Sequence, residues 1–164
     1  MTAVVVEKGV SMKFLFLGDI VGRAGRQVVL EHVPMLRQTQ KLDFVVANGE
    51  NAAGGFGINA SIFQDLREAG VDVVTLGNHA FDQREVVDML PWEERLIRPI
   101  NYPEGTPGRG ATLIEHDGFQ TLVINVMGRL FMDPLDDPFK AVDQALAGLN
   151  LGQDVDAIIV DVHA

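Results

Sequence analysis

The sequence contains no cysteine and no long apolar run, and it is poor in positive charge. Without cysteine, it cannot form disulfides, thiolate zinc sites, iron–sulfur clusters or a cysteine nucleophile, so any metal must be held by His, Asp, Glu or Asn. No apolar stretch approaches the ~20 residues that a membrane-spanning helix needs. Thirteen Lys and Arg stand against 23 Asp and Glu, giving a formal net charge of -10. That sign excludes binding to nucleic acid through bulk charge.

What is present is typical of a folded domain. The chain has 164 residues, with 47% hydrophobic and 22% charged, which is enough for one domain with a sizeable core. Residues 1–11 lack the layout of a secretory signal, because Glu7, Lys8 and Gly9 interrupt a short apolar run. We therefore expect residues 1–11 to form a flexible extension, residues 12–164 to form the domain, and the protein to be cytoplasmic.

Short apolar runs alternate with stretches of helical periodicity. The runs are nearly unbroken, as expected of strands buried on both faces, and comprise residues 14–17, 44–47, 71–76, 121–126 and 157–162. Residues 111–115 add a hairpin partner for the fourth run, turning around Asp117-Gly118. This pattern predicts a layered α/β/α fold with a mixed β-sheet and helices on both faces.

Capping residues mark where several helices should begin. Asn59 is a plausible N-cap, and Asp137 stands directly before a proline that suits a first helical turn. Asp82 with Glu85 resembles a capping box. Pro34 lies within an earlier helical stretch, where it should kink the helix or end its regular hydrogen bonding.

Polar side chains follow the predicted strands at the point where each strand ends. They occur in Gly18-Asp19, in Asn48-Gly-Glu-Asn51, in Gly77-Asn-His79 and in Asp161-Val-His163. Because ligands of open α/β sheets bind beyond the carboxyl ends of the strands, we expect these groups to converge. Their oxygen and imidazole donors suit Mn, Fe or Zn. A pair of cations would need a bridging carboxylate, and Glu50 is the candidate.

Taken singly, each residue also has a structural explanation. Asp19 and Asn51 suit a cap or a turn, His79 could cap the helix that follows it, and His163 could be an isolated histidine. The group as a whole is what favours a site.

Two other functions stay open at this point. A non-catalytic nucleotide-binding module would use Gly18, Gly22 and Gly25 as a phosphate loop, but Ile20 fills the second glycine position of the dinucleotide fingerprint. A regulatory module that contacts a partner protein is compatible with the acidic composition. Metal content and phosphodiester cleavage would separate these from an enzyme.

Three strings together resemble a known family. Gly18-Asp-Ile-Val-Gly22, Asn48-Gly-Glu-Asn51 and Gly77-Asn-His-Ala-Phe-Asp82 are similar to motifs of the calcineurin-like metallophosphoesterases, and within them to the YmdB-like phosphodiesterase branch. Val21 stands where the wider superfamily has the histidine of its Asp-x-His motif, and Glu50 replaces a bridging aspartate. Both departures are typical of the YmdB-like branch.

The resemblance implies an activity and a cofactor. The activity is metal-dependent hydrolysis of phosphate esters, above all of 2′,3′-cyclic nucleotides or similar small phosphodiesters, by a hydroxide that bridges two divalent metal ions (Fe, Mn or Zn). The implied metal ligands are Asp19, Glu50, Asn51, Asn78 and His163. His79 would be the catalytic residue that assists the leaving oxygen. The amides of Gly54 and Gly55 are candidates for contacts with the phosphate.

One family segment is missing from this sequence. The family closes its site with Gly-x-His-x-His, which does not occur here, so each metal would lack one histidine. We therefore expect the chain to be the amino-terminal part of a longer protein, and to bind metal weakly and turn over slowly on its own. We expect it to bind a small phosphodiester or nucleotide and not to bind a membrane or bulk nucleic acid. Whether it forms a homo-oligomer stays open.

Overall fold

The computed structural model describes residues 12–164, and the expectation of a flexible extension over residues 1–11 lies outside the described residues. The elements in chain order are β1 Phe14–Leu17, α1 Gly22–Gln40, β2 Phe44–Asn48, α2 Ala60–Glu68, β3 Val73–Thr75, α3 Arg84–Met89, β4 Leu96–Ile97, β5 Ala111–His116, β6 Phe119–Met127, α4 Pro138–Leu146 and β7 Ala157–His163. None of the helices within residues 12–164 is long and apolar enough to cross a membrane.

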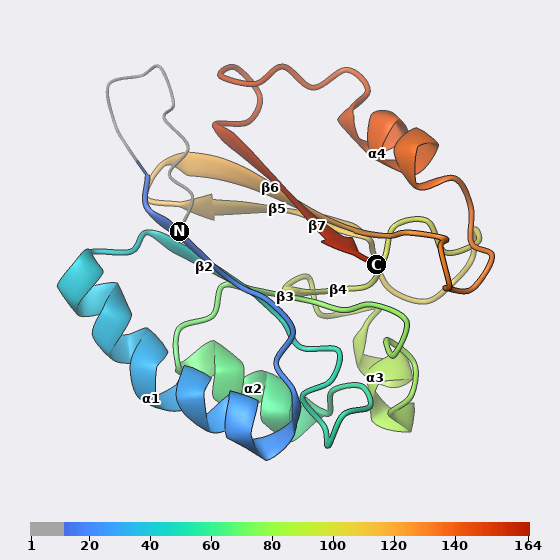
Figure 1. The fold of residues 1–164 in the computed structure, drawn as a ribbon. Helices are drawn as coiled ribbons and strands as arrows, with labels where there is room; N and C mark the ends of the chain where they lie inside the picture. The colour runs from blue at the N-terminus through green and yellow to red at the C-terminus, as the bar shows by residue number, and fades with distance from the viewer. Residues whose placement is uncertain (1–11) are drawn as a thin grey trace.

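The strands form two stacked sheets where the sequence suggested one. The first sheet has the order β1-β2-β3-β4 and is parallel throughout. The second has the order β5-β6-β7 and is mixed, because the predicted antiparallel hairpin β5–β6 pairs with the parallel strand β7. The α/β class with a mixed sheet and helices on both outer faces is confirmed, and Figure 1 shows α1, α2 and α3 on one side of the sheets and α4 on the other.

Three apolar clusters hold these layers together. Val33 of α1 and Leu66 of α2 belong to the cluster that covers the outer face of the first sheet. Phe44 and Val123 belong to the cluster between the two sheets, and Ile124 belongs to the cluster under α4. Burial of one such side chain contributes about 1.5–3 kcal/mol.

Strands β2, β3 and β4 are therefore buried on both faces, as the unbroken apolar sequences of β2 and β3 predicted. The same prediction was wrong for β1 and β7, which keep one partly open face: Phe16 is 46% exposed and Val162 is 63% exposed.

Most of the helix signals are confirmed. The Asn59 side chain accepts a hydrogen bond from Ile62 N at 2.9 Å, and the Asp137 carboxylate accepts from Phe139 N at 2.9 Å. Helix α1 continues through Pro34 as one helix of 19 residues. The buried side chains of Val29 and Val33 fix this helix on the sheet, and their packing offsets the hydrogen bond that proline cannot donate.

Two expectations about local structure were incomplete or wrong. The capping box is wrong, because α3 begins at Arg84 with Gln83 as its N-cap and no side-chain cap bond. Asp82 instead contacts His79. Strand β4 was not predicted, since two residues are too short to show a periodicity.

The strand ends define where a site can form. In the parallel first sheet Leu17 pairs with Ala47 and Asn48 pairs with Thr75, so β1, β2 and β3 end at the same edge. Strand β7 of the second sheet reaches this edge too, because the carboxylate of Asp161 accepts hydrogen bonds from the side chains of Thr75 and Asn48.

Candidate metal centre

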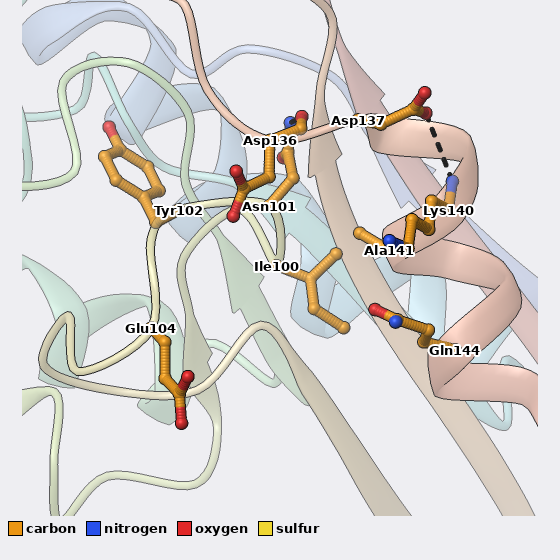
Figure 2. A pocket seen from close by; sticks show the side chains of 9 residues that line it. All are labelled: Ile100, Asn101, Tyr102, Glu104, Asp136, Asp137, Lys140, Ala141 and Gln144. Carbon is orange, nitrogen blue, oxygen red and sulfur yellow. Dashed lines mark hydrogen bonds between the residues drawn. The ribbon is translucent and has the colours of Figure 1, made fainter.

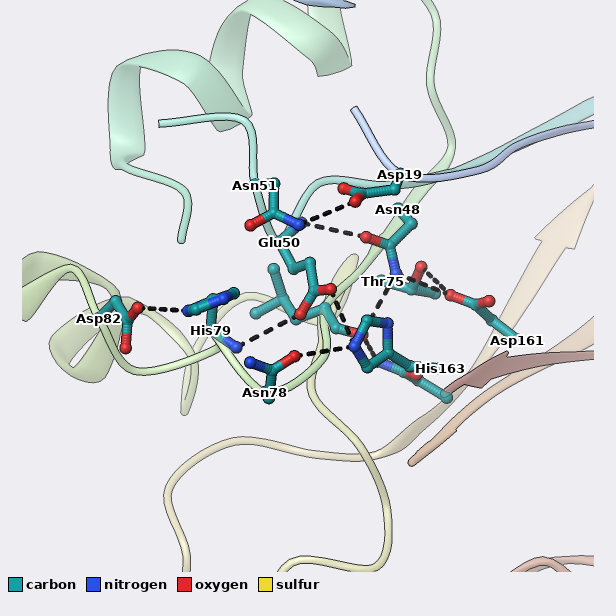
Figure 3. A network of polar contacts seen from close by, with 12 residues as sticks. Asp19, Asn48, Glu50, Asn51, Thr75, Asn78, His79, Asp82, Asp161 and His163 are labelled. Atoms are coloured by element: carbon teal, nitrogen blue, oxygen red, sulfur yellow. Dashed lines mark hydrogen bonds and ion pairs between the residues drawn. The ribbon is translucent and has the colours of Figure 1, made fainter. Parts of the chain in front are cut away.

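Three predicted ligands converge at this edge. Glu50 lies in the loop after β2, Asn78 follows β3, and His163 is the last residue of β7. His163 Nε2 lies 3.0 Å from Glu50 Oε1 and 2.8 Å from Asn78 Oδ1. Figure 3 shows the three side chains pointing toward one another from different segments. The structure therefore brings together one carboxylate, one amide oxygen and one imidazole nitrogen.

The other two predicted ligands form an adjoining pair. Asn51 Nδ2 donates a hydrogen bond to Asp19 Oδ2 at 2.8 Å, and Asn51 is the chain neighbour of Glu50. Asp19 follows β1 and is exposed. The hydrogen bond with Glu50 is the main influence that raises the pKa of His163, and the negative charge of Asp19 adds a smaller contribution in the same direction.

The centre contains a deeply buried carboxylate. Glu50 is only 1% exposed, and a buried negative charge is costly unless positive charge or hydrogen bonds compensate it. Its hydrogen bond to His163 raises the pKa of that imidazole, while partial burial of the ring acts in the opposite direction. The backbone N–H of His79 also donates to Glu50 Oε2 at 3.3 Å. A cation bound at Glu50 would therefore compensate the charge of a buried carboxylate whose position is already fixed by hydrogen bonds.

The donor set fits a divalent cation. His163 Nε2 makes an ion pair with Glu50 and a hydrogen bond with Asn78 at 3.0 and 2.8 Å, and ligand atoms of an octahedral cation with bonds of ~2.0–2.2 Å lie about as far apart, so a cation could replace these contacts with small shifts. Within residues 12–164 no three His, Asp or Glu side chains form a metal-binding group by themselves. A third ligand in either site must therefore be an asparagine oxygen. Asn78 Oδ1 already faces His163 Nε2, whereas the Asn51 amide presents Nδ2 to Asp19 and would have to turn over to offer its oxygen to a cation.

Gly77 leaves the space that this cluster occupies. A Cβ atom at this position would overlap the Glu50 carboxylate and lie 2.8 Å from His163 Cδ2. Any side chain here would therefore displace two of the proposed ligands. The sequence identified Gly77 as part of the Gly-Asn-His string, but it could not show that glycine is needed there to leave room for the Glu50 carboxylate.

Three buried polar residues support the centre. The sequence placed Asn48 and Asp161 among the polar groups at strand ends but gave them no role, and it did not single out Thr75. Asn48 donates from Nδ2 to Asp161 Oδ2 at 3.2 Å and accepts from Glu50 N at 3.2 Å through Oδ1. The hydroxyl of Thr75 also donates to Asp161 Oδ2. One signal was available: Asp161 stands two residues before His163 in a strand, so both side chains lie on the same face.

His79 lies beside the ligands and has its own carboxylate partner. Its Nδ1 lies 2.6 Å from Asp82 Oδ2, and its ring is partly exposed. A carboxylate on Nδ1 fixes the orientation of the ring and leaves Nε2 free of that contact. Figure 3 shows His79 between Asp82 and the cluster around Glu50.

Gly54 and Gly55 lie in the turn that follows Asn51. Their φ angles of 70° and 97° explain why glycine is used there. The N–H of Gly55 donates to Asn51 O at 2.9 Å, so a phosphate contact by this amide would require that bond to open. The role of both glycines in substrate binding stays a prediction.

A polar cavity elsewhere contains none of the predicted site residues. It has a volume of about 580 Å³ and lies between the segment around Asn101 and the start of α4 (Figure 2). Asp137 caps α4, and Asn101 Nδ2 donates to the carbonyls of Met127 and Asp136. These polar groups are engaged in the fold, so the cluster around Glu50 is the better candidate.

Known proteins resemble this chain over most of its length. The family model described as "YmdB-like protein" matches residues 15–164. The 2′,3′-cyclic-nucleotide 2′-phosphodiesterase of Bacillus subtilis is 43% identical over 153 residues, which cover 93% of this chain and 57% of that protein. A hypothetical protein from Thermus thermophilus has a similar structure, with a TM-score of 0.85 and 48% identity over 93% of this chain and 58% of that one. A phosphatase from Mycoplasma pneumoniae gives a TM-score of 0.81 and 31% identity over 93% and 55%.

The matched region covers nearly all of this chain but only part of its relatives. The chain spans 56–57% of the length of the curated relatives it matches. The shared part includes the strand ends that carry all five predicted metal ligands.

Proposed function

Because the chain belongs to the family of YmdB-like proteins, we propose that it carries the hydrolytic centre of a metal-dependent phosphodiesterase that acts on 2′,3′-cyclic nucleotides or similar small phosphodiesters. The similar protein from Bacillus subtilis bears the name of such an enzyme. This chain spans little more than half of that protein, so the activity, the substrate and the metals are proposals.

One observation carries the proposal. Glu50, Asn78 and His163 come from three separate segments, yet their ligand atoms meet within 2.8–3.0 Å around His163 Nε2. Helix capping or turn formation does not require such a meeting, because those roles are local in sequence. A carboxylate, an amide oxygen and an imidazole that converge in this way form a donor set that suits a divalent cation such as Mn, Fe or Zn.

The proposed assignment uses the two adjoining groups. Asp19, Glu50 and Asn51 would hold one cation, and Glu50, Asn78 and His163 would hold the other. When bound, such cations supply Lewis-acid chemistry that activates water and offsets the charge of a phosphate. Fe, Mn and Zn all suit this donor set.

His79 handles the proton on the leaving side in this proposal. Asp82 accepts the Nδ1 hydrogen, so the imidazolium can donate from Nε2 to the departing oxygen. The backbone N–H of His79 is tied to Glu50, and a Cβ on Gly57 would lie 3.1 Å from the His79 carbonyl oxygen, so the chain packs closely around His79. The ring is therefore held at a fixed place beside the ligands, as a general acid must be.

Three related expectations stay predictions from the sequence. They are the cytoplasmic location, the homo-oligomer, and the weak metal binding of these 164 residues by themselves.

A metal titration tests the proposal. Isothermal titration of Mn²⁺ into the chain should show saturable binding, and Glu50→Gln should weaken it at least about a hundredfold, because this carboxylate serves both cations. The same samples with saturating Mn²⁺ should cleave 2′,3′-cyclic AMP slowly, and Glu50→Gln should show no cleavage.

Glu31→Gln is the matched control, since Glu31 is an exposed carboxylate on α1. It should bind Mn²⁺ as the unaltered chain does. Equal Mn²⁺ affinity in the chain and in Glu50→Gln would overturn the proposed centre.

A further inference from the structure

Phe56 is an exposed aromatic residue beside the proposed general acid. Its side chain is 60% exposed, and its ring centroid lies 5.3 Å from that of His79, with the two ring planes at 90°. Isolated exposed apolar side chains are common and need no explanation. This one differs because it adjoins a residue at the candidate site and stands in the same loop as Asn51.

The loop holds Phe56 in a defined position. Gln83 Nε2 donates to the Phe56 carbonyl at 2.7 Å, and Ala53 N donates to Gly57 O at 2.8 Å across the loop. A Cβ on Gly57 would lie 2.9 Å from Gln83 Cγ, so the loop packs directly against the segment that follows His79. These contacts fix the backbone that carries Phe56, and the edge contact with His79 is the contact made by the ring itself. A side chain on a fixed backbone loses less freedom when a ligand covers it, which favours binding.

The chemistry at the centre indicates what would cover the ring. In a 2′,3′-cyclic nucleotide, the 2′ oxygen that leaves phosphorus is attached to the ribose carbon next to the one that carries the base. A histidine that donates a proton to this oxygen therefore lies beside the base. The Phe56 ring lies about as close to His79 as the base would lie to the leaving oxygen, with 5.3 Å between the ring centroids of Phe56 and His79. An exposed aromatic ring can bind any of the nucleobases by stacking.

We propose that Phe56 is a substrate-specificity residue, on which the nucleobase of the substrate stacks while the phosphate lies at Glu50, Asn78 and His163. This inference rests on the proposed function and adds the recognition of a base to it. It also accounts for an exposed phenylalanine in a loop whose neighbours are glycines with φ of 97° and 75° at positions 55 and 57.

Equilibrium binding separates base recognition from phosphate recognition. Adenosine 3′-monophosphate and inorganic phosphate are titrated into the Mn²⁺-loaded chain by calorimetry. Phe56→Ala should weaken nucleotide binding by about tenfold, because base stacking on one aromatic residue is worth about that much, and should leave phosphate binding unchanged. Phe56→Tyr should keep the affinity for the nucleotide.

A control variant and the possible outcomes distinguish failure of the stacking role from failure of the proposed function. Phe139→Ala is the control, because Phe139 is an exposed phenylalanine at the start of α4, and it should change neither affinity. Unchanged nucleotide binding in Phe56→Ala, or an equal loss for nucleotide and phosphate, would overturn the stacking role while the phosphodiesterase proposal stands. A Mn²⁺-loaded chain that binds neither ligand would overturn the proposed function, and this inference with it.

Discussion

At Gly77 a single added methyl group should disable the proposed centre. The Cβ of Gly77→Ala would overlap the Glu50 carboxylate and press on the ring of His163, so both side chains must move. We expect Mn²⁺ affinity to fall at least about tenfold, because shifted ligands lose bond geometry. The unfolding free energy should fall by about 1–3 kcal/mol, the usual range for overpacking. Calorimetry and urea denaturation measure the two quantities.

Gly128→Ala provides the matched comparison. A Cβ on Gly128 would meet its nearest atom, Ala164 Cβ, at the ordinary contact distance of 3.5 Å. This variant should retain metal binding and stability. Should Gly77→Ala bind Mn²⁺ as tightly as Gly128→Ala, the tight fit around Glu50 has no bearing on the metal.

Individual site residues could be found from the sequence where chemistry and position agreed. Glu50, Asn78 and His163 combine a metal-binding side chain with a place at the end of a strand, and the structure brings them together. Asp82 was misassigned because its spacing to Glu85 satisfies a local rule for helix starts. The structure gives it a different partner: its carboxylate lies 2.6 Å from His79 Nδ1. A local pattern does not show which of two partners a carboxylate will take.

At the scale of elements, the strand sequences identified the strands but not the sheets. Residues such as Phe44 and Val45 are fully buried, so β2 is apolar on both faces. The sequence does not distinguish a face covered by helices from a face covered by a second sheet. The two-sheet arrangement depends on packing between β2 and β6, whose residues Phe44 and Val123 are 79 positions apart and share a cluster. For that reason it could not be predicted from local patterns.

The hydrogen bonds of Asp161 join the two sheets at the edge that carries the centre. Asp161 is 7% exposed on β7 and accepts hydrogen bonds from Thr75 and Asn48 of the first sheet. Thr75→Val keeps the shape of the side chain and removes one donor from a buried carboxylate. We expect the unfolding free energy to fall by about 1–3 kcal/mol, as measured by urea denaturation, because a buried charged acceptor loses a partner.

Thr121→Val is the control for Thr75→Val, because it makes the same change of side chain without removing a hydrogen bond. Thr121 is fully buried on β6, and its hydroxyl has no hydrogen-bond partner among the described residues. Removing an unpaired buried hydroxyl should leave stability unchanged or raise it. If both variants were equally stable, the contact between Asp161 and the first sheet would not contribute to holding the sheets together.

At the scale of the whole molecule, the net charge disfavours the binding of a long polyanion. The formal net charge is -10, and several of the 13 basic residues have acceptors within the fold. Arg37 pairs with Asp72, Arg26 donates to the Ala52 carbonyl, and Arg98 donates to four backbone carbonyls between Pro99 and Gly108. A long phosphate backbone needs many free cations along its path, whereas a small diester needs charge compensation at only one phosphate.

We therefore expect the chain to bind small nucleotides and not polymeric nucleic acid. A fluorescein-labelled single-stranded DNA of about 30 nucleotides should show no change in anisotropy up to ~100 µM protein at ~50 mM salt, a condition under which basic DNA-binding proteins bind any sequence. The Mn²⁺-loaded chain should still bind adenosine 3′-monophosphate under the same conditions, because the cations at Glu50 supply the positive charge that the surface lacks. DNA binding that weakens steeply with added salt would show instead that basic side chains form a continuous track, and the restriction to small diesters would then be wrong.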